Sequence, residues 1–131
     1  MLMRMAEFGC GACFQSPTPE AAWETRRKFT KLAELVVETH FDILLMACPA
    51  CGQACVSVFT ERIDWAGGED PQEWQVLPLT AAEVEALRAD PTESRVESFG
   101  AGRPMLRRDF PSGEGAKSGW TTGPIRIGPH D

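Results

Sequence analysis

The chain has 131 residues, of which 43% are hydrophobic, and its formal net charge at pH 7 is −6. This length suits one domain with an appended segment, and two full hydrophobic cores are not expected. The apolar runs are too short to span a membrane, and no secretory signal is seen, so we expect a cytoplasmic protein without membrane contact. Five cysteines then favour a metal site in a reducing compartment over a disulfide framework.

The first elements along the chain are a cysteine turn and a helix. Residues 6–14 form a tight turn, and the segment 16–19, which contains two prolines, then breaks the chain. Within it, Thr18 is a suitable N-cap with Pro19 at the first helical position. Apolar residues between Ala22 and Val37 recur at about the helical period, which predicts a helix over about 19–38. Its β-branched end, from Val36 onward, also suits the start of a strand.

Strands are predicted next, followed by a second helix. The runs 41–47 and 53–65 are rich in apolar and β-branched residues and predict an antiparallel hairpin. Residues 73–77 alternate and predict a third strand ending at Pro78. Thr80 and Glu83 have the spacing of a capping box, which predicts a short helix over 81–89.

The last forty residues lack periodicity. Residues 92–131 contain seven glycines and four prolines, which predicts an irregular tail after a domain that covers residues 1–91. If the tail is ordered, its apolar side chains must cover the sheet or a partner, because ordering the chain loses entropy. These side chains are Phe99, Met105, Leu106, Phe110, Trp120 and Ile125.

Two C-x-x-C pairs are the most specific motif. Cys10-Gly-Ala-Cys13 and Cys48-Pro-Ala-Cys51 are separated by 34 residues, and four thiolates in a tetrahedron suit one Zn²⁺ or one iron ion. Gly52 supplies the permissive dihedral that a tight metal-binding turn needs. We therefore predict one zinc ion, with iron as the alternative, held by Cys10, Cys13, Cys48 and Cys51.

The same motif resembles the zinc-ribbon and rubredoxin-like group over residues 6–65. With the elements above, the expected fold is a small α+β zinc ribbon: a three-stranded antiparallel sheet, a helix inserted between the cysteine turns, a short C-terminal helix and an irregular tail. The resemblance implies a structural metal in a protein-interaction module or accessory subunit, and we expect no enzyme. Single-electron transfer by iron and nucleic-acid binding are the alternatives.

Charge distribution favours a protein partner over nucleic acid. Residues 32–91 carry eleven acidic and two basic side chains, whereas affinity for nucleic acid comes mainly from basic ones. The expected partner surface lies around a Gly-Gly turn and comprises Trp65, Glu69, Asp70 and Trp74, since indoles often anchor interfaces. The competing interpretation is that both indoles belong to the core.

The fifth cysteine and the two histidines are not expected to bind the metal ion. Cys55 follows the second pair on a predicted strand, and we expect a buried core residue there rather than a ligand. A thioredoxin-type dithiol at Cys48 and Cys51 is disfavoured, because a strand rather than a helix follows the pair. His40 and His130 lack ligand spacing.

Overall fold

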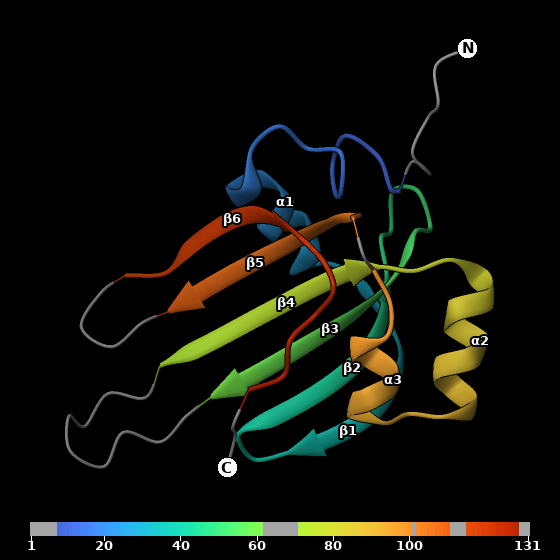
Figure 1. The fold of residues 1–131 in the computed structure, drawn as a ribbon. Coiled ribbons are helices and arrows are strands. Elements are labelled where there is room, and N and C mark those ends of the chain that lie inside the picture. Colours follow the sequence, from blue (N-terminus) through green and yellow to red (C-terminus); the bar gives the residue numbers. More distant parts are fainter. Residues whose placement is uncertain (1–7, 62–70, 101, 111–114, 129–131) are drawn as a thin grey trace.

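The fold is given by a computed structural model, and the structure describes residues 8–61, 71–100, 102–110 and 115–128. The described strands form one antiparallel sheet in the order β1-β2-β3-β4-β5-β6 (Figure 1). The strands are β1 (Thr30–Glu38), β2 (Phe41–Ala47), β3 (Ala54–Glu61), β4 (Gln72–Pro78), β5 (Pro104–Phe110) and β6 (Lys117–Thr122). The helices are α1 (Pro19–Arg26), α2 (Ala81–Ala89) and α3 (Glu93–Glu97).

The expected three-stranded zinc ribbon with a long inserted helix is therefore wrong. The predicted helix over about 19–38 ends at Arg26, and the chain continues as β1, the edge strand beside β2. The pairing of β1 with β2 shifts register twice, between Lys31 and Ala33 and between Glu34 and Val36. Each shift adds a residue to β1 and interrupts the two-residue alternation, so its apolar residues imitate the helical period.

The prediction of an irregular tail over residues 92–131 is also wrong, because this segment forms α3, β5 and β6. Leu106 of β5 is paired with Val76 of β4 on one side and with Trp120 of β6 on the other. Charged residues fill much of β5, which hid the strand from a search for apolar runs. The boundary expected after residue 91 lies between α2 and α3, and the chain on both sides of it contributes strands to the same sheet.

Several local predictions are confirmed. Strands β2 and β3 form the expected hairpin, with Ala47 paired with Ala54 beside the cysteine turn, and β4 ends at Pro78. Helix α2 has the predicted bounds and capping box: the Glu83 N–H donates to Thr80 Oγ1 at 3.2 Å, and the Thr80 N–H donates to Glu83 Oε1 at 2.9 Å. No helix among the described residues is long and apolar enough to cross a membrane.

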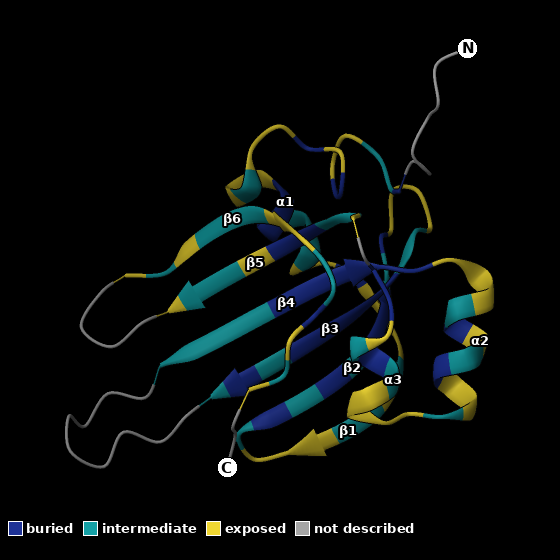
Figure 2. Cartoon of the chain, in the orientation of Figure 1, coloured by how far each residue is buried: buried dark blue, intermediate teal, exposed yellow. Residues whose placement is uncertain are grey.

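The sheet has a hydrophobic core on each face. Helices α2 and α3 cover one face and α1 lies against the other, while Figure 2 shows the central strands largely buried and the edge strand β1 largely exposed. The side chains of β3 point alternately to the two faces of the sheet: Val56 and Val58 belong to the first core and Cys55 to the second. The former tail residues contribute to these cores: Phe99, Met105 and Ile125 to the first, Leu106 to the second.

Candidate metal centre

Four cysteine sulfurs meet where the segment before α1 touches the turn between β2 and β3. The Sγ atoms of Cys10, Cys13, Cys48 and Cys51 all lie within 4.8 Å of one another. Cys13 Sγ is 3.8 Å from Cys10 Sγ and 3.8 Å from Cys51 Sγ. A tetrahedron with metal–sulfur bonds of about 2.3 Å has edges of about 3.8 Å. These four cysteines thus fit one tetrahedral metal ion.

The first cysteine turn depends on Gly9. Its φ is +75°, and a Cβ built there would lie 2.5 Å from Cys13 Sγ. The turn is closed by the N–H groups of Cys13 and Gln15, which donate to the Cys10 carbonyl at 2.9 and 3.0 Å. The Cys10 N–H donates to Cys13 Sγ at 3.2 Å. Gly9 therefore supplies both a left-handed dihedral and the space that the Cys13 sulfur occupies.

The second cysteine turn caps the β2–β3 hairpin. The Cys48 N–H donates to the Gln53 carbonyl at 3.0 Å, and the Gly52 N–H donates to the Cys48 carbonyl at 2.8 Å. Gly52 has a φ of +81°, as its place after the cysteine pair predicted. The hairpin thereby holds Cys48 and Cys51 on a hydrogen-bonded turn at the end of two largely buried strands.

The four thiols differ in their surroundings. Cys13 and Cys48 are buried, Cys10 is half-buried and Cys51 is exposed. The Ala12 N–H lowers the pKa of the Cys10 thiol, whereas burial raises the pKa of the Cys13 thiol. A buried thiolate needs a compensating positive charge, and a metal cation supplies one and deprotonates coordinating thiols. The site therefore has two buried cysteines, Cys13 and Cys48, and two that are at least partly exposed, Cys10 and Cys51.

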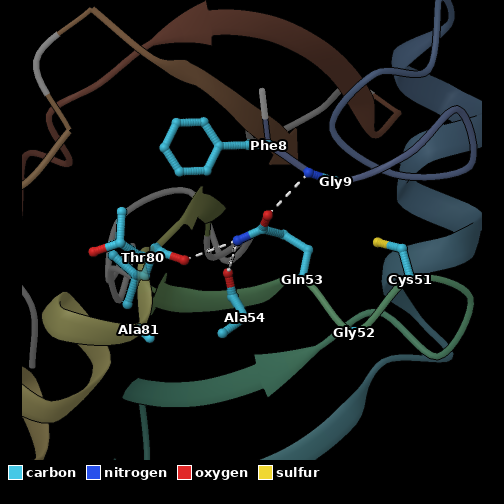
Figure 3. Close-up of a pocket in the computed structure, with 9 residues that line it drawn as sticks. Phe8, Gly9, Cys51, Gly52, Gln53, Ala54, Thr80 and Ala81 are labelled. Carbon is cyan, nitrogen blue, oxygen red and sulfur yellow. Dashed lines mark hydrogen bonds between the residues drawn. The ribbon is translucent and has the colours of Figure 1, made fainter. Parts of the chain in front are cut away.

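Gln53 links the two cysteine turns, and sequence reasoning missed it. Its Oε1 accepts the Gly9 N–H at 2.9 Å, and its Nε2 donates to the carbonyls of Ala54 and Leu79, each at 2.8 Å (Figure 3). In the sequence, only its position two residues after Cys51 could have suggested a role at the cysteine turns. The partners of its side chain lie as far as 44 residues away along the chain.

Arg103 provides a second attachment for the first turn. Its guanidinium lies 4.7 Å from the centre of the Phe8 ring. It also donates to the Pro78 carbonyl at 2.9 Å and to both carboxylate oxygens of Glu83, at 2.6 and 2.9 Å. The residue before Gly9 is thus held against the junction between β4 and α2 by a cation–π contact.

Cys55 lies apart from this group. It is fully buried in the second core, and the cluster of potential metal ligands found among the described residues does not include it. Burial raises the pKa of the Cys55 thiol to about 12, so at neutral pH it is an uncharged thiol. The interpretation of Cys55 as a core residue agrees with this position.

Of the residues expected to form a partner surface, the structure describes Trp74. The Trp74 ring packs 4.9 Å from Phe59 and 5.3 Å from Trp23, measured between ring centroids, at the second core. Trp65, Glu69 and Asp70 lie outside the described residues. His40 Nδ1 lies 2.8 Å from Glu61 Oε1 at the opposite end of the β2–β3 hairpin, and His130 is outside the described residues.

Comparison with protein-family models, with curated proteins and with solved structures found no match. Within the part of the chain that the structure describes, the four-cysteine cluster is the feature from which we infer a function.

Proposed function

We propose that this protein binds one Zn²⁺ ion through Cys10, Cys13, Cys48 and Cys51, and that the ion has a structural role. The observation that carries the proposal is the convergence of four sulfurs within 4.8 Å of one another. Four protein ligands complete the tetrahedron, and a closed coordination sphere is typical of structural zinc sites rather than catalytic ones.

The ion would join two parts of the chain that are distant in sequence. One part is the segment before α1, which places Phe8 and Phe14 in the second core. The other is the β2–β3 hairpin turn. A metal bridge between them would fix the path into α1, the helix that packs on β5 and β6. The expected contribution of the ion is to anchor this segment to the sheet.

Iron is the alternative ion, because it accepts the same four-sulfur tetrahedron. The insert between the cysteine pairs and the lack of tyrosine distinguish this chain from rubredoxin-like proteins, which favours zinc. A ferric tetrathiolate is red, whereas a zinc protein is colourless, so the colour of the purified protein distinguishes the two ions.

We further propose that the protein acts as an interaction module for a protein partner and not as an enzyme. The acidic composition of residues 32–91 supports a protein over a nucleic acid as the partner, because it repels nucleic-acid phosphates. A fluorescence titration with single-stranded and duplex oligonucleotides at physiological salt should show no binding. Saturable binding that weakens as salt rises would favour the nucleic-acid alternative instead.

The direct test of the proposed function is metal content after purification without added metal. We expect one zinc ion per chain in the wild-type protein and a severe loss of metal in Cys13→Ser and Cys48→Ser, because each removes a buried ligand. Cys55→Ala is the matched control and should retain full stoichiometry. A metal-free wild-type protein, or full occupancy in Cys48→Ser, would refute the site.

A further inference from the structure

We infer that Gln53 is a positioning residue of the metal site, which holds the first cysteine turn against the second before the metal binds. Zinc would then enter a tetrahedron that the protein has already assembled. The inference rests on the proposed function, since it concerns the same four sulfurs.

Gln53 is fixed by bonds on both ends of its amide. The Nε2 group has two hydrogens, and these meet the Ala54 and Leu79 carbonyls, each at 2.8 Å. The Leu79 N–H in turn donates to the Ala54 carbonyl at 2.9 Å. The amide therefore belongs to the hydrogen-bonded end of β3 and β4, and its Oε1 is presented to Gly9 in one orientation.

Gly9 is the residue through which Gln53 acts on the ligands. It directly precedes Cys10, and its α-carbon lies so close to Cys13 Sγ that a Cβ would be only 2.5 Å from that sulfur. Gln53 holds the Gly9 N–H, while Gln15 Nε2 donates to the Gly9 carbonyl at 3.0 Å. Displacement of Gly9 would therefore move both cysteines of the first turn.

The hydrogen bond between Gly9 and Gln53 lies beside open space into which the first cysteine turn could move. A pocket of about 540 Å³ lies beside the metal centre, with Phe8 and Gly9 on one side and Thr80 and Ala81 on another. Gln53, the residue directly before β3, extends between these sides (Figure 3). Loss of its side chain would enlarge the pocket and free the Gly9 N–H, leaving the first turn room to move away from the second.

The expected consequence is a loss of metal affinity with little change in the sheet. Residues that orient metal ligands contribute about 10- to 100-fold to affinity. The Phe8–Arg103 contact and the second core do not include the Gln53 side chain, so a Gln53 variant should still fold.

The test compares Gln53→Ala and Gln53→Met with the matched control Gln72→Ala. Gln72 lies at the other end of the β3–β4 pair, where its Nε2 donates to Glu61. Methionine keeps the length of the side chain but removes all three hydrogen bonds. Metal-free proteins are titrated with Co²⁺, whose sulfur-to-metal absorption band reports thiolate coordination, in competition with a chelator of known affinity.

We expect both Gln53 variants to bind Co²⁺ about 10- to 100-fold more weakly than the wild type, with the same band at saturation, and Gln72→Ala to match the wild type. Thermal unfolding with and without metal gives a second readout, because weaker binding narrows the gap between the two midpoints. Unchanged affinity with both midpoints lowered equally would show a merely structural role and overturn the inference. Absence of the band in the wild type would instead refute the metal site itself, and the inference with it.

Discussion

At the scale of single residues, the metal centre depends on positions whose backbone only glycine adopts easily. Gly9 and Gly11 flank Cys10 but differ in their surroundings. Gly9 has a positive φ and abuts Cys13 Sγ, whereas a Cβ at Gly11 would meet no atom within 4 Å. This contrast provides a matched pair of variants within one turn.

Gly9→Ala should lower the unfolding free energy by about 1–2 kcal/mol from the left-handed backbone alone, and it should also weaken metal binding by displacing the Cys13 sulfur. Gly11→Ala should change both quantities little. Denaturant unfolding and Co²⁺ titration measure the two effects. Equal behaviour of the two variants would show that the crowding at Gly9 has no bearing on the site.

The four cysteines of the cluster could be predicted from the sequence because the C-x-x-C spacing and the trailing Gly52 are local signals. The sequence does not reveal the residues that hold the two turns together. Gln53 meets Gly9 across 44 residues, and Arg103 meets Glu83 across 20. A glutamine and an arginine have many uses on a protein surface, so only the folded chain shows that these two approach the metal centre.

At the scale of secondary-structure elements, α2 was predictable because its signals are adjacent in sequence. Thr80 and Glu83 cap the helix reciprocally, and Arg103 then pairs with the Glu83 carboxylate. Strand β1 was mistaken for a helix because two register shifts disrupt its alternation. Strand β5 was missed because its charged residues give no apolar pattern. Its pairing with β4 and β6 identifies it as a strand.

The Glu83 interactions predict a pH dependence of stability. Burial raises the pKa of Glu83, but hydrogen bonds from Arg103 and from the Thr80 N–H outweigh burial and hold the pKa below its ordinary value of 4.5. A carboxylate with a lowered pKa stabilises the fold above its unfolded-state pKa, and this contribution disappears as pH falls through the folded-state pKa.

Glu83→Gln should therefore be less stable than the wild type at neutral pH, and the difference should shrink as pH falls below about 4.5. Urea unfolding of both proteins along an acid series measures it. Glu93→Gln, an exposed position in the first turn of α3, is the control for losing one carboxylate near a helix start. A difference that stays constant or widens in acid would contradict the assigned role of the Arg103–Glu83 pair.

At the scale of the whole molecule, the fold is larger than one whose stability comes mainly from a bound metal ion. The residues that the structure describes form six strands and three helices with a core on each face of the sheet, whereas a small ribbon depends on its ion for folding. The difference from a small ribbon comes largely from β5 and β6, which are formed by the segment that we expected to be an irregular tail. The ion is expected to stabilise one end of the molecule locally.

Removal of metal with a chelator should therefore leave the far-ultraviolet circular dichroism of the sheet largely intact. Hydrogen exchange should become faster in the segment 8–16 and in the 48–53 turn, where backbone bonds close the two cysteine turns. The central strands β3 and β4 should remain protected. Loss of the whole strand signal on chelation would show that the metal supports the entire fold.

The central claim is that four cysteine sulfurs from two separate turns hold a single ion. X-ray absorption of protein purified without added metal tests this most directly, because the absorption edge identifies the element and the fine structure gives its neighbours. The account predicts zinc surrounded by four sulfur atoms at about 2.3 Å, at one ion per chain. A shell containing nitrogen or oxygen ligands, or a protein without bound metal, would contradict it.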